Sequence, residues 1–307
     1  MCGIHSNCTC TSGASSMRNA TFPLAVLAAV FAATPAMAEQ VQGSFTLNSL
    51  PKPERNIYKG NYLIIGLGVA NMPTFEGSKN QGLFPAAGIM GRYHGININP
   101  RTAGVAIDII KDPEDSRIGF SFGPVIRWRA GRSPSAKDAV LASLGRVKGN
   151  LELGVTAGIQ FKKLTNGYDS LSLGVDVRWD ATGKSGSRVI SFGPSYFTPV
   201  SKRQIVGLST SIDFVNRRYS NLNFGVSSVG STASGLPMYG GRSGIKSIGV
   251  KAFTAYDLDG DLRNGGFAVG LGVGYTMLQG SAAQSPITAM RGRRSRFNLA
   301  AGLAYAF

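Results

Sequence analysis

The sequence is poor in cysteine, histidine and acidic residues. Its 307 residues include 3 Cys, 2 His and 16 Asp+Glu against 32 Lys+Arg, which gives a formal net charge of +16. The cysteines Cys2, Cys8 and Cys10 lie with His5 ahead of a predicted signal peptide. Because a discarded leader does not fold around an ion, we expect no metal site there, and the mature chain has no cysteine for a disulfide.

Long hydrophobic runs are missing outside the N-terminal segment. A membrane-spanning helix needs about 20 consecutive apolar residues, and no run past residue 38 approaches that length. The mean hydropathy of +0.04 and the 43% of hydrophobic residues are nevertheless too high for a disordered chain. With 41 Gly and only 16% charged residues, the composition favours many strands over helices. An all-β protein is predicted.

The N-terminal segment has the features of an export signal. A short positive region follows Met17, an apolar run covers 22–33, and an Ala-X-Ala cleavage site ends at Ala38. The next residue is Glu39 rather than a cysteine, so lipid attachment is not expected. We therefore predict three parts: a leader and signal peptide at 1–38, a periplasmic N-terminal arm at 39–57, and a barrel at 58–307.

Apolar residues alternate with polar or small residues along most of the mature chain. Between positions 151 and 161 the odd residues are apolar and the even ones polar or glycine, and the pattern recurs at 171–180, 269–276 and 297–307. Runs of about ten residues match tilted strands that cross a membrane. A soluble β-sandwich would also alternate, but here the polar face is mostly Gly, Ser, Thr and Ala. The pattern favours a closed antiparallel transmembrane β-barrel.

Twelve strands are predicted, with ten as the alternative. The segment at 221–229 is weak, and its loss would require a second loss because bacterial barrels have an even number of strands. Pro124 and Pro194 lie inside predicted strands, so we expect β-bulges or strand ends there. The predicted strands are 61–70, 83–93, 103–110, 117–129, 150–162, 169–180, 188–198, 204–215, 221–229, 245–257, 266–278 and 296–307.

Charged residues on the polar face are few and of both signs, as suits a narrow lumen. They could neutralise one another and block a pore, or line a path for small solutes, and the sequence leaves both open. Aromatic residues near strand ends are expected to form girdles at the two membrane interfaces. The predicted lumen charges are Asp108, Arg127, Arg129, Glu152, Asp176, Arg178, Asp180, Asp213 and Lys251. The predicted girdle residues are Tyr62, Tyr93, Trp128, Trp179, Tyr196, Phe214, Tyr256 and Tyr275.

Residues for catalysis or metal binding are scarce. His94 is the only histidine of the mature chain, so any histidine-dependent hydrolase would have to use it as the base. The Asp-Leu-Asp-Gly-Asp sequence at 257–261 resembles the start of a calcium loop, but Ala268 stands where that loop needs Glu. We predict a polar turn there, no metal or other cofactor, and a protein that is not an enzyme.

The densest basic cluster precedes the last strand and contains Arg291, Arg293, Arg294 and Arg296. In the twelve-strand count this loop faces outward, where the phosphates of lipopolysaccharide lie. We expect either contact with those phosphates or a merely solvated loop. Nucleic acid is not an expected partner, because an exported barrel would not ordinarily meet it.

Two connections, 130–149 and 230–244, are longer than hairpins require. In the twelve-strand count the first is periplasmic and the second extracellular. Residues 136–144 could form a short helix with Val140 and Leu144 on one stripe. The first loop and the arm at 39–57 are candidate docking surfaces for a periplasmic partner, and a partly ordered connector that plugs the barrel is the alternative.

Several short segments follow one another across residues 58–307 in a recognisable order. They are Gly66-Leu67-Gly68-Val69, Phe75-Glu76-Gly77-Ser78, the Phe-Gly-Pro tripeptides at 122–124 and 192–194, Phe224-Gly225-Val226-Ser227, Ser234-Gly235-Leu236-Pro237 with Tyr239, the segment from Gly244 to Gly249, Ser285-Pro286-Ile287 and the final Phe307. In this order and spacing they resemble the MipA/OmpV family.

The resemblance implies an outer-membrane β-barrel of a Gram-negative cell. The founding member is described as a scaffold that joins a murein-degrading lytic transglycosylase to a bifunctional penicillin-binding synthase, and other members are linked to adhesion or to osmotic and antibiotic responses. Outer-membrane lipid and lipopolysaccharide would surround such a barrel. The last strand, with Tyr305 and Phe307, is the expected signal for the barrel-assembly machinery.

Overall fold

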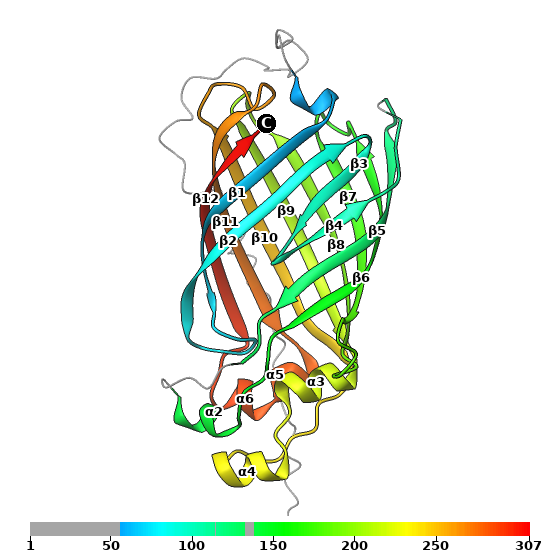
Figure 1. The fold of residues 1–307 in the computed structure, drawn as a ribbon. Coiled ribbons are helices and arrows are strands. Elements are labelled where there is room, and N and C mark those ends of the chain that lie inside the picture. The colour runs from blue at the N-terminus through cyan, green and yellow to red at the C-terminus, as the bar shows by residue number, and fades with distance from the viewer. Residues whose placement is uncertain (1–55, 114, 133–137) are drawn as a thin grey trace, which may run out of the picture. The chain divides into compact units, whose positions relative to one another are not determined.

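The computed structural model describes residues 56–113, 115–132 and 138–307, and the strands of this part form a closed barrel. Each strand pairs antiparallel with its neighbours in the chain, and β1 closes the barrel by pairing with β12 (Figure 1). The predicted fold class is confirmed. The strands are β1 (Tyr62–Pro73), β2 (Gln81–Tyr93), β3 (Ile96–Arg101), β4 (Gly104–Asp108), β5 (Ile118–Arg129), β6 (Asn150–Lys162), β7 (Ser170–Asp180), β8 (Arg188–Pro199), β9 (Gln204–Val215), β10 (Gly244–Asp257), β11 (Gly266–Leu278) and β12 (Ser295–Ala306).

The predicted number of strands is correct, but one member of the set is not. The segment predicted as a strand at 221–229 belongs to helix α3 (Arg217–Phe224) and the residues after it. This helix starts where the side chain of Asn216 accepts a hydrogen bond from the amide of Tyr219. The strand missed by the sequence is β3, whose alternation is too short to stand out. The two errors cancel in the count.

The outer face of the barrel is apolar. Leu67 is 66% exposed, Leu83 74% and Leu299 57%, and other large apolar side chains accompany them on β5, β6 and β11. A continuous apolar belt of this kind is unfavourable in water. It is the surface that a spanning barrel presents to lipid, so we treat the strands as membrane-spanning.

Exposed aromatic residues mark both edges of this belt. Trp128, Trp179 and Phe214 lie at the last or penultimate positions of β5, β7 and β9, whereas Tyr93 and Tyr256 lie at the opposite end on β2 and β10. Amphipathic rings favour the level of the lipid headgroups. The two sets therefore indicate where the two membrane interfaces cross the barrel.

The two ends of the barrel differ in the length of their connections. At the turn end, where the described chain begins and finishes, the strands are joined by short turns such as 94–95 and 200–203. At the opposite loop end the connections 130–149, 216–243 and 279–294 are long and carry the α-helices of the described chain (Figure 1). No helix among the described residues is long and apolar enough to cross a membrane. The helices are α2 (Ala139–Ser143), α3 (Arg217–Phe224), α4 (Ser228–Ser234), α5 (Gly280–Gln284) and α6 (Pro286–Ala289), and a 3-10 helix, η2 (Ile57–Lys59), precedes β1.

The position of the connection 130–149 corrects the sequence prediction. It follows β5, so it lies at the loop end, opposite to the termini of the barrel. The prediction placed it at the periplasmic end because β3 was not recognised and one crossing was left out. The connection 230–244 lies at the end opposite the termini, as predicted. The number of predicted strands before it is correct, because the false strand at 221–229 compensates for the missed β3. Short periplasmic turns and long extracellular loops are the rule for bacterial barrels.

The two prolines inside strands do not produce the expected bulges. Pro124 pairs with Val155, and Pro194 pairs with Leu173, in registers that run without a shift. The ladder on the other side of each proline is interrupted instead: β4 pairs with β5 only from Val125 onward, and β8 and β9 have no pairing between Phe192 and Ser195. A proline has no backbone donor, so the lost hydrogen bond falls on that side.

Candidate functional site

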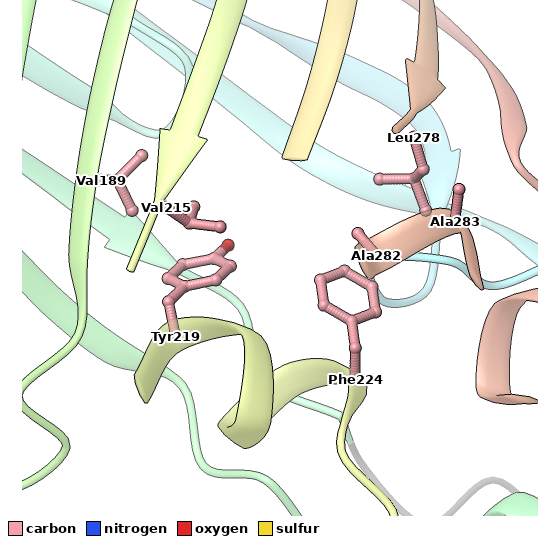
Figure 2. Close-up of a cluster of buried hydrophobic side chains, with 7 residues drawn as sticks. All are labelled: Val189, Val215, Tyr219, Phe224, Leu278, Ala282 and Ala283. Carbon is pink, nitrogen blue, oxygen red and sulfur yellow. The ribbon is translucent and has the colours of Figure 1, made fainter. Parts of the chain in front are cut away.

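The loop end of the lumen is filled by the long connections. From α3, Tyr219 and Phe224 point into the mouth of the barrel, where Val189 and Val215 lie at strand ends (Figure 2). Leu278 and two alanines at 282 and 283 complete this cluster from β11 and α5. All seven side chains are buried. Helices α3 and α5 are therefore packed against the mouth of the barrel by apolar contacts.

A second apolar cluster joins three connections at the same end of the barrel. Its buried members are Leu141 from α2, Val226 and Leu236 on either side of α4, and Ile287 from α6. Phe75, Val140, Leu144 and Tyr239 pack against it. The predicted helix at 136–144 is present over Ala139–Ser143, and its predicted apolar stripe faces this cluster; residues 136–137 lie outside the described chain. The connections that contribute to the two clusters, at 74–80, 138–149, 216–243 and 279–294, together form a cap at the loop end.

On the lumen side of the cap, Arg178 on β7 is the centre of a buried ion network. Its guanidinium donates to Glu152 and Asp176, each at 3.3 Å, and to the hydroxyl of Ser191 at 2.8 Å. Glu152 also accepts from Arg129 at 3.0 Å. Arg178, Glu152, Asp176 and Arg129 are all buried. Buried charges need such partners, because an unpaired one is strongly unfavourable.

The β3–β4 hairpin extends this network across the lumen. Arg101 at the end of β3 donates to Asp176 at 2.9 Å and to Thr156 at 3.3 Å. The hydroxyl of Thr102, in the hairpin turn, accepts from Lys251 on β10 at 2.9 Å. Neither β7 nor β10 is a neighbour of the hairpin in the barrel wall. The side chains at the tip of the hairpin therefore reach into the lumen, while the turn itself stays bonded to β5, where the amide of Trp128 donates to the carbonyl of Ala103 at 2.8 Å.

Lys246 on β10 joins the strands to the cap. Its ammonium lies 2.7 Å from a carboxylate oxygen of Glu76, in the β1–β2 loop, and 3.2 Å from Asp213 on β9. The second oxygen of Glu76 accepts from the hydroxyl of Tyr219 at 2.7 Å. Burial alone raises the pKa of Glu76, but the positive charges of Lys246 and Arg296, together with the hydrogen bonds from Lys246 and Tyr219, outweigh it and lower the pKa to about 2. Glu76 is thus held as a carboxylate at neutral pH.

Very little space remains between these side chains. The enclosed cavity among Arg127, Arg129, Glu152, Lys246 and Glu76 has a volume of about 10 Å³, which is room for about one water molecule. The network and the cap together close the loop end of the lumen over the described residues.

The turn-end half of the lumen is different. Lys251 and Phe253 point inward from β10, where Phe253 lies against Gly207, yet both are exposed, Phe253 by 47%. The inner faces of β11 and β12 near the turn end carry glycine or alanine, as at Gly270 and Gly302. An inward side chain with this exposure means that solvent enters from the turn end. The lumen is thus a vestibule that is open at the turn end and filled at the loop end.

The remaining predicted lumen charges have separate positions. Asp108, near the turn end of β4, is buried and accepts from the amides of Ile110 and Phe122 at 3.0 and 3.1 Å. Asp180 lies at the end of β7 and accepts from the amides of Thr182 and Ser185, so its carboxylate organises the turn at 181–187 rather than the network.

Four members of the network were not found in the sequence, and each was missed for a physical reason. Glu76 lies in a loop, where alternation gives no information, although its tetrapeptide is part of the family resemblance. Lys246 turns inward because the register shifts between Ile245 and Ser247. Arg101 belongs to the unrecognised β3. Tyr219 belongs to the helix predicted as a strand.

The four arginines predicted as a lipopolysaccharide contact do not share one surface. Arg291 pairs with Asp138 at 2.9 Å, and this hydrogen-bonded pair, with smaller contributions from the α2 amides, lowers the pKa of Asp138. Arg296 alternates with the exposed Phe297 and faces the lumen. Arg293 and Arg294 are exposed at the loop end.

The side chains considered for catalysis and calcium binding, His94 and the aspartates at 257–261, have structural roles in turns. His94 lies with a positive φ of 50° in the β2–β3 turn, and its ring stacks edge-on against Tyr93 at 4.4 Å. In the turn after β10, Asp257 accepts from the amide of Gly260, Asp259 from that of Phe267, and Asp261 pairs with Arg263. Over the described residues no group of three His, Cys, Asp or Glu side chains could hold a metal ion.

The last strand closes the barrel. Its end is fixed by the amide of Phe307, which donates to the carbonyl of Leu63 on β1 at 2.8 Å. The ring of Tyr305 packs edge-on against Phe267 at 4.7 Å and against Phe307 at 4.7 Å. Tyr305 and Phe307 are exposed on the outer face at the turn end.

Comparison with known proteins gives one sequence family and several barrels. The family described as MltA-interacting protein MipA matches residues 65–307, well over half of the chain. No curated protein sequence matches the chain significantly. Among solved structures, an outer-membrane channel of Pseudomonas putida F1 has 13% identity and a TM-score of 0.45, covering 84% of this chain and 100% of its own.

Two further barrels are less similar. The outer-membrane protein OmpT of Vibrio cholerae has 6% identity and a TM-score of 0.34, covering 80% of this chain and 97% of its own. The toluene transporter TodX of Pseudomonas putida has 11% identity and a TM-score of 0.34, covering 83% and 90%. At these values the assignment of the fold depends on the strand pairing described above, and no function is carried over.

Proposed function

This chain belongs to the MipA family of outer-membrane barrels, and we propose that it is a scaffold that docks a murein-degrading lytic transglycosylase at its periplasmic turn end. The main observation in support of this proposal is that side chains fill the loop end of the lumen. The ion network and the cap leave a cavity of about 10 Å³, so the wall and the turns, rather than a pore, are the surfaces available for function. A non-enzymatic role is part of this proposal.

The turn end offers a surface suited to a protein partner. Ile109, Leu164, Val200 and Leu258 each lie in a different turn and are 52%, 51%, 53% and 52% exposed. These aliphatic residues lie at the first or second position of four successive turns, and we call them the apolar rim of the turn end. Such residues, interspersed with polar groups, are typical of protein interfaces.

The docking surface therefore differs from the one first expected. The connection 130–149 lies at the loop end, out of reach of periplasmic enzymes in the orientation proposed here. The arm at 39–57 stays a candidate, although its residues 39–55 lie outside the described part of the chain. A penicillin-binding synthase as second partner, and recognition of the last strand by the barrel-assembly machinery, are carried over from the family resemblance.

The rival function is a small-solute channel. It would require the cap and the network to move, because Arg178, Glu152 and Lys246 occupy the lumen. Single-channel conductance in planar bilayers separates the two functions. The scaffold proposal expects no persistent open state at resting voltage, and a persistent open pore in the wild-type protein would favour transport.

Docking is tested by crosslinking the tagged mature protein in its native envelope and identifying captured proteins by mass spectrometry. The test variant replaces three rim residues, Leu164→Ser, Val200→Ser and Leu258→Ser. We expect the wild type to capture a lytic transglycosylase and the variant to lose most of that capture, because a core of apolar contacts dominates interface energies.

A matched control carries the same kind of change at the loop end. Val229, Met238 and Met290 are 78%, 65% and 61% exposed, and their replacement by serine should leave capture unchanged. Equal loss of capture in the two variants would contradict docking at the turn end. So would loss of capture in the loop-end variant alone. Recovery of lipopolysaccharide and other barrels alone from the wild type would contradict the scaffold role.

A further inference from the structure

A shallow open hollow lies at the loop-end rim of the barrel, outside the lumen. It has a volume of about 390 Å³, and three arginines, Arg188, Arg217 and Arg218, line it beside Trp179. Arg188 begins β8, whereas Arg217 and Arg218 begin α3. Two segments separated in sequence therefore place three guanidinium groups around one space.

The hollow is held in shape by Asn216. Its side-chain oxygen accepts from the amide of Arg188 at 3.1 Å, and its side-chain nitrogen donates to the carbonyl of Gly186 at 2.9 Å. Arg218 lies against Gly186, where an added Cβ would come within 2.3 Å of the guanidinium. The start of α3 is thus fixed to the β7–β8 turn, and the absence of a side chain at Gly186 gives Arg218 its place.

The three arginines are not neutralised by the protein. None of them forms an ion pair with a carboxylate in the part of the chain that the structure describes. The acidic groups nearest in the chain are already engaged: Asp180 by its own turn and Asp213 by Lys246. All three arginines are exposed, so their donors are free for a ligand.

The hollow lies at the level of a membrane interface. Trp179 is the register partner of Arg188, so both side chains leave the wall on its outer face. Trp179 and the neighbouring outward residues Phe192 and Phe214 are 45%, 45% and 40% exposed. The surface thus changes from aromatic to basic at the height where lipid headgroups lie.

We propose that this hollow binds the phosphate groups of a lipid A-type glycolipid of the outer leaflet. Guanidinium groups bind phosphate oxygens through paired, charge-assisted hydrogen bonds. The acyl chains of the same lipid would lie against Trp179 and Phe214 on the wall. A free phosphate ion would satisfy the arginines but would leave the aromatic surface without a role, so a lipid is the favoured source.

The charge of the whole loop end supports the same ligand. Its acidic residues in the described chain, Glu76, Asp138 and Asp180, are all hydrogen-bonded to neighbouring groups. Its exposed charged side chains are therefore basic, and they attract an anionic leaflet. These exposed residues are Lys79, Arg146, Lys148, Lys184, Arg188, Arg217, Arg218, Arg242, Arg293 and Arg294.

The test measures binding of bisphosphorylated lipid A to the purified mature barrel in detergent by native mass spectrometry. The triple variant R188Q/R217Q/R218Q should bind more weakly by about fivefold to tenfold for each arginine. R188K/R217K/R218K should recover part of the affinity, because it keeps the charge but loses the paired hydrogen bonds. Heat-dependent gel mobility checks that each variant is folded.

The matched control removes three exposed arginines from the same end, R242Q/R293Q/R294Q, and should change the affinity by less than about twofold. Equal losses in both triple variants would overturn the proposal, because binding would then follow net charge alone. So would unchanged binding of dephosphorylated lipid A to the wild type. Displacement of lipid A by inorganic phosphate at equal concentration would reassign the hollow to a free anion.

Discussion

The carboxylate of Glu76 lies 2.7 Å from the ammonium of Lys246 and 2.7 Å from the hydroxyl of Tyr219. These three groups come from a loop, a strand and a helix that are far apart in sequence. The contact fixes the β1–β2 loop and α3 to the wall of the barrel. Closure of the loop end therefore depends on a small set of ionic contacts, and these can be removed one at a time.

The first prediction concerns Lys246→Met. This change leaves Glu76 and Asp213 without their shared cation, and breaking a buried ion pair on one side destabilises by about 3–5 kcal/mol. We expect weaker resistance to urea unfolding in lipid vesicles and frequent conductance openings in planar bilayers. The control is Lys251→Met, whose ammonium is exposed and bonds to Thr102; it should have a small effect. Equal effects of the two variants would show that Lys246 is not the main contact that holds the cap to the barrel wall.

A second prediction follows from the pKa of Glu76, which is lowered from 4.5 to about 2. A lowered pKa means that the contribution of the carboxylate to stability is complete above about pH 4.5 and is lost as the pH falls toward 2. The cap should therefore stay closed from pH 7 to about pH 4.5, and conductance should rise below that. Burial, followed by the charge of Glu76, raises the pKa of Tyr219, so its hydroxyl remains a donor throughout this range.

The measurement is single-channel conductance as a function of pH, with Glu76→Gln as the comparison. The glutamine variant has no carboxylate at this position to titrate, so its conductance should not change between pH 4.5 and 2 through this contact. Opening of the wild type between pH 7 and 5 would show that a different group controls the cap.

The third prediction compares the stability lost on replacing a buried arginine, Arg178, with that lost on replacing an exposed one, Arg188, on the next strand. Arg178 is 2% exposed and binds Glu152, Asp176 and Ser191, so Arg178→Met should lower the free energy of unfolding by about 3–5 kcal/mol. Arg188→Met, on the outer face of β8, should lower it by less than about 1 kcal/mol. Urea titration of both variants in the same lipid gives the comparison, and similar midpoints would contradict a structural role for the network.

Long, regular strands could be read from the sequence. The segments at 150–162, 204–215 and 266–278 were predicted with the bounds that β6, β9 and β11 have in the structure, because a strand with one face toward lipid must alternate over its whole length. β3 could not be found in this way. It is a strand of six residues, and only the first three of them pair with β2, so the alternation is too short to stand out.

The helix α3 was missed because two periodicities overlap. Leu222, Phe224 and Val226 alternate as in a strand, while the burial of Ser220 and Phe224 follows a helical spacing of four. The capping residue Asn216 was the local signal for a helix. For the ion network, the alternation of apolar and polar residues correctly predicts that Glu152 faces the lumen. It does not predict which residues Glu152 contacts, because those depend on the register between strands, which a single sequence does not specify.

The last prediction tests the orientation on which the proposed docking surface depends. The three cysteines of the sequence lie at positions 2, 8 and 10, ahead of the predicted cleavage site, so the mature barrel can carry single engineered cysteines. Ser143 in α2 is exposed at the loop end, and Leu164 is 51% exposed at the turn end. A membrane-impermeant maleimide added to intact cells should label Ser143→Cys and not Leu164→Cys.

Both positions should react after the outer membrane is permeabilised, which controls for accessibility and folding. Labelling of Leu164→Cys on intact cells, with protection of Ser143→Cys, would reverse the barrel. The connection 130–149 would then be periplasmic, the apolar rim around Leu164 would be extracellular, and the basic hollow beside Trp179 would face the inner leaflet. Docking at the turn end and lipid A binding at the loop end therefore depend on the same labelling result.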